Sequence, residues 1–238
     1  MTIKQQPSGE QVIATVRAEF GPRTGVLFSL GKDSVAATLA LRPHFDELVP
    51  VYLYYIPGLS FVEEALDYYE RNLFGGRHIV RMPHPSLYRW LNNFVFQPPD
   101  RIEVIRAANL PTFDYADIHQ LVRQSEGLPD GTLFASGVRA ADSPIRRLSL
   151  NQHGPIRRSR GEFFPVWDWN KDRLVSEIAK SGLRLPEDYK LFGRSFDGID
   201  ARFLIPLKKH RPADYQRVLE WFPLAELEVF RIEQMRAA

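Results

Sequence analysis

Apolar and polar positions follow two different periods along the chain. Short unbroken apolar runs, typical of strands buried in a parallel sheet, occupy residues 25–30, 47–56, 78–82, 132–138 and 163–167. Between these runs, apolar residues recur at the three- and four-residue spacing of amphipathic helices. The helices predicted in this way cover residues 35–40, 62–73, 116–122, 172–181 and 213–234, the last broken near Pro223.

Strands that alternate with helices favour an α/β fold. We expect a three-layer, doubly wound, mostly parallel five-stranded sheet with helices on both faces. Residues 1–182 are predicted to form this domain, and residues 183–238 a helical C-terminal extension packed on it. Residues 83–113 fit neither period well, because Trp90, Leu91 and Phe94 suggest a short helix followed by a Pro-Pro loop.

Composition narrows the function classes. Of the 238 residues, 44% are hydrophobic and 25% are charged. The 31 Lys and Arg residues against 29 Asp and Glu give a net charge of +2, which does not indicate any class of binding partner. The chain has no cysteine, so it holds no disulfide, cysteine zinc site, iron–sulfur cluster or thiolate nucleophile of its own. The N-terminal residues lack a signal-peptide core and no apolar run is long enough to span a membrane, so we expect a cytoplasmic protein.

A glycine turn between the first predicted strand and the first predicted helix is the clearest candidate for a ligand-binding loop. In Ser29-Leu30-Gly31-Lys32-Asp33-Ser34, backbone amides at a helix N-terminus, two hydroxyls and one ammonium group favour an anion such as phosphate. The alternative is a plain strand-to-helix connection with Asp33 or Ser34 as helix cap. A Walker loop is excluded because five residues separate Gly25 from Gly31 and Asp33 follows the lysine, and no G-x-G-x-x-G occurs.

An arginine-rich segment follows the fourth predicted strand. Residues 139–160 contain six arginines, no lysine and one acidic residue. The segment leaves the sheet at the same edge as residues 29–34, so Arg139 and Arg146 are the candidates for binding phosphate or sulfate oxygens. For Arg157, Arg158 and Arg160, a solvated loop or a contact with RNA is the favoured interpretation.

Other polar and aromatic positions favour structural roles. The six histidines lack the spacing of a metal site. Trp167 and Trp169 flank Asp168 at strand spacing, which favours core packing over base stacking. The basic run of residues 208–211 is typical of a solvated helix face.

The glycine turn resembles the S-G-G-K-D-S loop of the PP-loop superfamily, whose members include phosphoadenosine phosphosulfate reductases, with Leu30 in place of a glycine. Residues 57–63 partly resemble that family's T-G-x-x-F-P-E, and residues 137–146 resemble G-I-R-x-x-E-S-x-x-R, with Asp142 for the Glu. Residues 164–169 are similar to its P-I-x-x-W segment. The resemblance extends from about residue 25 to residue 181.

The resemblance implies an adenine-nucleotide site at the carboxyl edge of the sheet. The ligand would be ATP or phosphoadenosine phosphosulfate, with Mg²⁺ oriented by Asp33 and no iron–sulfur cluster. The catalytic candidates are Lys32, Asp33, Arg139 and Arg146. The nucleotide-binding candidates are Ser29, Leu30, Gly31, Lys32, Asp33, Ser34, Tyr55, Gly58, Gly137, Arg139 and Arg146.

Three functions stay open at this point. The first is an enzyme that activates an acceptor by adenylylation, in sulfur metabolism or nucleic-acid modification. The second is a reductase-like or sulfotransferase-like protein that binds phosphoadenosine phosphosulfate and relies on a thiol-bearing partner, because this chain has no thiol. The third is a nucleotide sensor or RNA-binding module on the same fold. No membrane partner is expected, and a homo-oligomer is compatible with each function.

Overall fold

The computed structural model describes residues 6–237, which form two compact units. Unit 1 comprises residues 6–52, 69–81 and 115–185, and unit 2 comprises residues 53–68, 82–114 and 186–237. The C-terminal residues therefore group with two internal segments, and the predicted division after residue 182 stays a prediction. None of the helices in the described range has the length and apolar character needed to cross a membrane.

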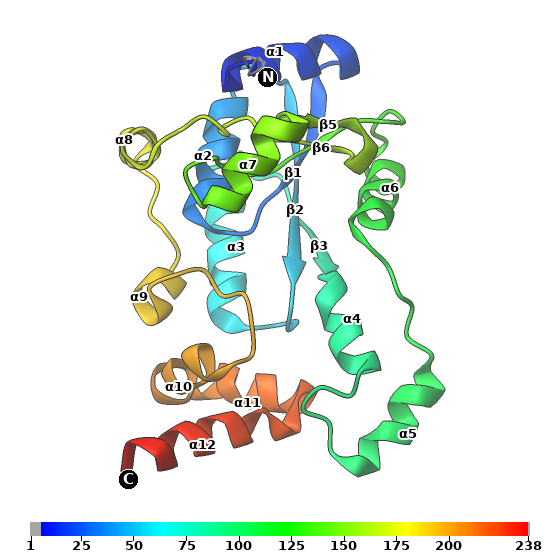
Figure 1. The fold of residues 1–238 in the computed structure, drawn as a ribbon, viewed down its shortest axis with the longest axis vertical. Helices are drawn as coiled ribbons and strands as arrows, with labels where there is room; N and C mark the ends of the chain where they lie inside the picture. The colour runs from blue at the N-terminus through cyan, green and yellow to red at the C-terminus, as the bar shows by residue number, and fades with distance from the viewer. Residues whose placement is uncertain (1–5, 238) are drawn as a thin grey trace. The chain divides into compact units, whose positions relative to one another are not determined.

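The elements of unit 1 are connected in the alternating order expected from the sequence (Figure 1). They are α1 (Gly9–Phe20), β1 (Arg23–Leu27), α2 (Lys32–Leu41), α6 (Tyr115–Glu126), β4 (Phe134–Ala135), α7 (Pro144–His153), β5 (Ile156–Arg157), the 3-10 helix η1 (Arg158–Arg160), β6 (Glu162–Phe163) and α8 (Lys171–Ser181). Three further elements belong partly to each unit, namely β2 (Glu47–Tyr54), α3 (Ser60–Asn72) and β3 (Val80–Pro83).

The sheet confirms the predicted α/β class. Its strand order is β3-β2-β1-β4-β6-β5, and β1 pairs in parallel with both β2 and β4, with Gly25 opposite Val49 on one side and Phe134 on the other. The chain order reverses between β1 and β4, which is the position where ligands bind in doubly wound sheets. The loops that follow these two strands, residues 28–31 and 136–143, are therefore the natural place for a site.

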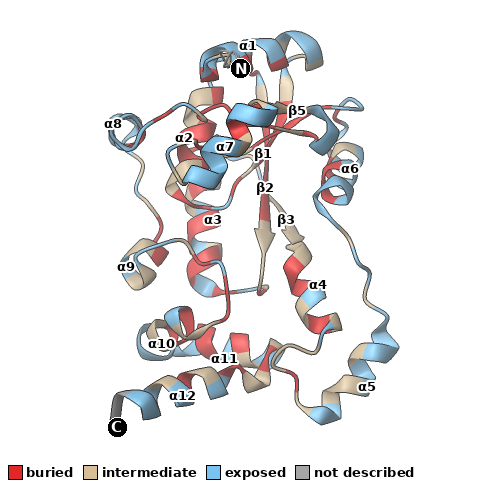
Figure 2. Ribbon diagram, viewed as in Figure 1, coloured by how far each residue is buried: buried red, intermediate tan, exposed pale blue. Residues whose placement is uncertain are grey.

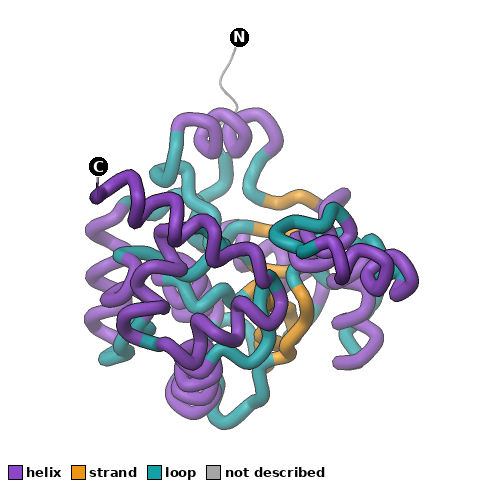
Figure 3. Tube along the Cα trace, turned by 90° about the horizontal axis from the view of Figure 1, so that it is seen from below, coloured by secondary structure: helices purple, strands orange, loops and turns teal. Residues whose placement is uncertain are grey.

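Helices cover both faces of this sheet. Ala135 packs in one hydrophobic cluster with Val12 and Val16 of α1, whereas the ring of Phe134 stacks on His119 of α6 with centroids 4.3 Å apart. Neighbouring residues of a strand point to opposite faces, so α1 and α6 lie on opposite sides of β4. Figure 2 shows buried residues along the central strands and on α2 and α3, and Figure 3 shows that helices make up much of the chain outside the strands.

The sheet has six strands where five were predicted. The additional strand, β5, pairs antiparallel with β6 through Ile156 and Phe163. The predicted strand over residues 163–167 ends at Phe163, because the backbone then turns and Trp167 N donates to Phe164 O. Helix α1 was not predicted, although Ser8 and Gln11 form a capping box at its start that is visible in the sequence.

Unit 2 is helical outside the ends of β2 and β3. It contains α4 (Pro85–Asn92), α5 (Pro99–Ala108), α9 (Asp188–Phe192), α10 (Ala201–His210), α11 (Pro212–Trp221), the 3-10 helix η2 (Pro223–Ala225) and α12 (Glu226–Ala237). The predicted break near Pro223 is confirmed, and residues 83–113 form two helices rather than one. Phe61, Phe192, Phe196 and Phe203 pack edge to face or tilted against one another in its core.

Candidate functional site

The predicted anion loop lies between β1 and α2, as expected. Gly31 is the N-cap of α2 in an extended conformation (φ −70°, ψ 153°), and no side chain caps this helix end. The buried Ser34 hydroxyl donates to Gly31 O at 2.8 Å and lies 3.4 Å from the Ser29 hydroxyl. The alternative in which Asp33 or Ser34 caps the helix is therefore not observed. The amides in the first turn of a helix carry a partial positive charge, which favours an anion at this position.

Leu30 gives this loop an unusual backbone. Its φ is +63°, in the left-handed region that favours glycine, although its side chain is 3% exposed and contributes to the core. The left-handed conformation costs a non-glycine residue about 1–2 kcal/mol. Burying a leucine side chain stabilises the fold by about 1.5–3 kcal/mol, which offsets that cost. The loop thus keeps a glycine-type backbone without the glycine of the S-G-G-K-D-S pattern.

Two substitutions at Leu30 separate strain from burial. We expect Leu30→Gly to be more stable than Leu30→Ala by about 1 kcal/mol, the reverse of the usual order, because both lose the buried side chain and only glycine relieves the left-handed strain. Urea denaturation of the two variants measures this difference. An alanine variant equal to or more stable than the glycine variant would contradict the assigned backbone.

Gly137 lies in the loop that follows β4 (residues 136–143, called the second loop below) and allows it to contact the first turn of α2 directly. A Cβ atom at this position would lie 2.5 Å from both the carbonyl carbon and oxygen of Asp33 and 2.8 Å from Ser34 N. Contacts below 3.0 Å do not occur at real Cβ atoms, so only glycine allows this approach. The structure therefore brings Gly137 together with the predicted residues of loop 29–34.

Arg139 also reaches this loop, but its guanidinium is already engaged. The buried side chain donates from Nε to Asp33 Oδ1 at 2.8 Å, from Nη2 to Asp142 Oδ1 at 2.7 Å and from Nη1 to Trp169 O at 3.3 Å. Arg146 lies on α7, where its Nη1 donates to Asp142 Oδ2 at 2.8 Å and its side chain is 53% exposed. The predicted role of these arginines as anion ligands stays a prediction.

Lys32 and Asp33 form an ion pair at the mouth of the loop. Lys32 Nζ lies 2.6 Å from Asp33 Oδ2, and both side chains are about one-third exposed. The two oxygens of Asp33 thus contact one cation each, Lys32 and Arg139. The carboxylate of Asp33, which lies in the first turn of α2, is thus paired with two cations, and one-third of the Lys32 side chain is exposed to solvent.

Tyr55 and Gly58, the predicted adenine contacts, belong to unit 2. The Tyr55 ring stacks against His84 and Trp90, with centroids 4.3 Å and 5.3 Å away. His84 Nδ1 accepts from Ser86 N and caps α4, and burial, with a smaller contribution from Arg89, lowers the pKa of His84 to about 4. This histidine is neutral near pH 7. The role of Tyr55 and Gly58 toward a nucleotide stays a prediction.

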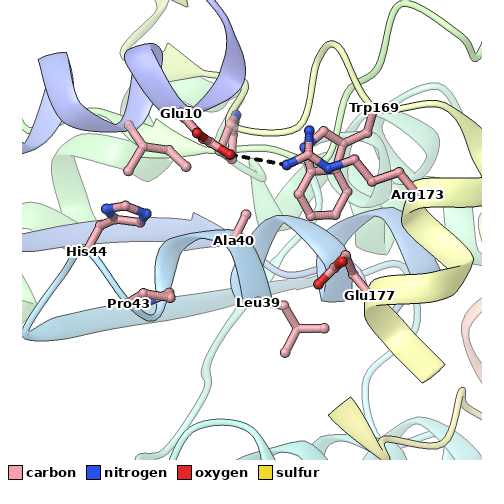
Figure 4. A pocket seen from close by; sticks show the side chains of 10 residues that line it. Glu10, Leu39, Ala40, Pro43, His44, Trp169, Arg173 and Glu177 are labelled. Carbon is pink, nitrogen blue, oxygen red and sulfur yellow. Dashed lines mark hydrogen bonds and ion pairs between the residues drawn. The ribbon is translucent and has the colours of Figure 1, made fainter. Parts of the chain in front are cut away.

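A separate cavity of about 220 Å³ lies in unit 1 between α1, α2 and α8. Figure 4 shows its lining, where Arg173 lies over the Trp169 ring and donates to Glu10 at 3.3 Å. The lining contains no residue of loop 29–34 or of residues 137–146. Trp169 is buried and Trp167 packs on the core, in agreement with the structural role predicted for both.

Comparisons with known proteins give one similar solved structure and assign the chain to no family. No protein-family model matches the chain, and no curated protein matches it. Among solved structures, the chain is similar to the U34-tRNA thiolase NcsA from Methanococcus maripaludis with its 4Fe-4S cluster. The TM-score is 0.46 at 14% identity, covering 91% of this chain and 79% of that chain. A likeness of this size does not establish a shared activity.

The cofactor prediction is contradicted by this comparison: no resident cofactor is assigned to the chain, and an adenine nucleotide is considered only as a candidate substrate. The sequence predicted ATP or phosphoadenosine phosphosulfate with Mg²⁺ and no iron–sulfur cluster, whereas the matched structure carries a cluster. Cysteine thiolates hold such clusters, and this chain has no cysteine, so the cluster is not assigned to it either. Within residues 6–237, no group of three or more His, Asp or Glu side chains could hold a metal ion.

Proposed function

We propose that the chain is an enzyme of the PP-loop type that binds the phosphate tail of an adenine nucleotide on loop 29–34 and transfers the adenylyl group to an acceptor. The observation that carries this proposal is the first turn of α2, which begins at Lys32, has no side-chain cap and follows β1, where the strand order reverses. Helix N-termini at this position bind phosphates. The resemblance of residues 29–34 and 137–146 to the PP-loop motifs supports an adenine nucleotide in particular.

The chemistry required of the site is mainly positioning and charge stabilisation. The amides of the first turn and the Lys32 ammonium would hold the β- and γ-phosphates, leaving the α-phosphorus open to attack. An acceptor oxygen forms a bond to this phosphorus as the bond to the bridging oxygen breaks, and pyrophosphate leaves with the negative charge. The helix end and Lys32 would stabilise this charge as it develops.

The surface beside the loop supports an acceptor that itself carries phosphate, such as a nucleic acid. Helix α7 has no acidic residue, and Arg146 and Arg147 are exposed on it. Figure 2 shows most of α7 as exposed. Exposed arginines bind backbone phosphates through bidentate hydrogen bonds.

Product identification tests the proposed reaction. The wild-type chain is incubated with ATP labelled at the α-phosphate, with and without RNA or DNA, and the products are separated. We expect AMP or an adenylylated acceptor together with pyrophosphate. Release of ADP would contradict attack at the α-phosphorus. If ATP leaves the melting temperature unchanged at millimolar concentration, nucleotide binding itself is wrong, because a ligand that binds only the folded state stabilises it.

A lysine substitution tests the loop. We expect Lys32→Ala to raise the Kd for ATP at least tenfold, since a hydrogen bond to a charged group contributes about 1.5–3 kcal/mol. The melting temperature should change little, because ion pairs exposed to solvent, as the Lys32–Asp33 pair partly is, add at most about 1 kcal/mol. Lys180→Ala is the matched control, since Lys180 forms a comparable pair with Glu177 at 2.7 Å on α8. Equal affinities of the two variants for ATP, measured by calorimetry, would contradict the site.

A further inference from the structure

Five residues of alternating charge form one continuous chain of ion pairs across the site. Lys32 contacts Asp33, Asp33 contacts Arg139, Arg139 contacts Asp142, and Asp142 contacts Arg146, with nitrogen–oxygen distances of 2.6, 2.8, 2.7 and 2.8 Å in that order. Two members of this chain are poorly exposed: the side chains of Arg139 and Asp142 are 6% and 13% exposed. Those of Asp33, Lys32 and Arg146 are 29%, 33% and 53% exposed.

We infer that Arg139 and Asp142 are positioning residues that fix the second loop against the first turn of α2, and that Lys32 and Arg146 are the cations that meet the phosphates. This inference rests on the proposed function, because it assigns roles for the same nucleotide. It also changes the role that the sequence predicted for Arg139, from a group that contacts the nucleotide to one that acts through its neighbours.

The hydrogen bonds of Arg139 support this assignment. Nε, Nη1 and Nη2 each donate to a protein acceptor, and these acceptors come from three separate segments of unit 1: Asp33 on α2, Asp142 before α7, and the Trp169 carbonyl before α8. A guanidinium that joins three segments sets their relative positions. Turning it toward a phosphate would remove this partner from both carboxylates, and the Asp142 side chain is only 13% exposed to solvent.

Asp142 closes the second loop on itself. Its Oδ2 accepts from the backbone N–H of Arg139 at 3.1 Å and from Arg146, while its Oδ1 accepts from the Arg139 guanidinium. The backbone of Arg139 and its side chain are thus held by one carboxylate. Gly137, two residues earlier, lies against Asp33, so a change in this loop moves the first turn of α2.

Asp142→Asn distinguishes a positioning role from a purely electrostatic effect, because the two predict opposite changes in the affinity for ATP. Removing a negative charge near an anion site would strengthen ATP binding if charge alone mattered. If Asp142 positions Arg139, we expect the Kd for ATP to rise at least tenfold. Asp172→Asn is the matched control, since Asp172 is an exposed acid on α8 of the same unit, and its Kd should stay within twofold of the wild type.

A double-substitution cycle supplies a readout that a general loss of stability would not move. We expect Arg139→Gln to weaken binding tenfold or more in the wild type and less than threefold in the Asp142→Asn background, because both remove the same arrangement. Lys32→Ala should weaken binding by a similar factor in both backgrounds. A full effect of Arg139→Gln in both backgrounds would show that Arg139 contacts the nucleotide directly.

The outcomes separate this inference from the proposed function. If the wild-type chain binds no ATP, the proposed function is wrong. If the wild type binds ATP and Asp142→Asn binds it equally or more tightly, only the positioning role is overturned. Should Asp142→Asn fail to fold, Arg139→Lys takes its place. Lysine keeps the positive charge but lacks the planar guanidinium that forms several hydrogen bonds at once, so we expect this variant to lose as much affinity for ATP as Arg139→Gln. Retained affinity in Arg139→Lys would overturn the inference.

Discussion

The Gly137→Ala variant is expected to bind ATP at least a hundredfold more weakly than the wild type. The added Cβ would lie 2.5 Å from the Asp33 backbone, where ordinary contacts begin at 3.4 Å, so the first turn of α2 and the second loop must separate by about 1 Å. The neighbour is backbone and has no rotamer to change. A shift of this size would break hydrogen bonds from the first turn to the phosphates, and losing two bonds to a charged group, at about 1.5–3 kcal/mol each, weakens binding about a hundredfold or more.

The same substitution at another glycine controls for the general effect of an added methyl group. Gly198 is free of positive φ, and a Cβ there would meet its nearest atom at 3.6 Å, which is ordinary contact. We expect Gly198→Ala to keep wild-type affinity. Calorimetric titration with ATP and thermal unfolding measure both variants. Wild-type affinity in Gly137→Ala would show that the approach of the two loops is unnecessary for binding.

The strand–turn–helix at loop 29–34 could be predicted from sequence because its determinants are local. The apolar run over residues 25–30 predicts a strand that overlaps β1, and the helical spacing over residues 35–40 predicts a helix that lies within α2. Parallel pairing then brings the ends of β1 and β4 together whatever the details of the loops. The meeting of loop 29–34 with residues 137–146 follows from these two facts.

The roles of Arg139 and Asp142 could not be predicted in the same way. The sequence of a basic segment does not show whether an arginine side chain faces solvent or is buried. Here the Arg139 side chain is buried and its guanidinium is paired with the carboxylates of Asp33 and Asp142. Asp33 is 106 residues away along the chain. Strand β5 was missed for a related reason, because two residues without a clear period give no local signal.

Unit 2 contains a carboxyl group whose ionisation opposes folding. Asp188 is 4% exposed at the start of α9, and its Oδ2 accepts from Phe196 N at 3.1 Å. Burial raises the pKa of Asp188 to about 6, an effect that hydrogen bonds from the Phe196 and Tyr189 backbone only partly offset. Relative to an ordinary aspartate pKa of about 3.9, this corresponds to about 3 kcal/mol.

Asp188→Asn is therefore expected to gain stability relative to the wild type as the pH rises. Below about pH 4 the carboxyl is protonated in both states and costs nothing. Between pH 4 and 6 the unfolded chain ionises while the folded chain keeps its proton, so the wild type loses stability as the pH rises, and above pH 6 the loss is complete. Asparagine resembles the protonated form and avoids this loss.

Urea denaturation at pH 4, 5, 6 and 7 and constant ionic strength measures the effect. The free energy of unfolding of Asp188→Asn minus that of the wild type should increase by about 2 kcal/mol across this range, or about 4–8 °C in melting temperature for a chain of this size. The other titrating groups are common to both chains and cancel in the difference. A difference that stays constant with pH would mean that Asp188 is ionised at its ordinary pKa in the folded chain, and that water reaches it in unit 2.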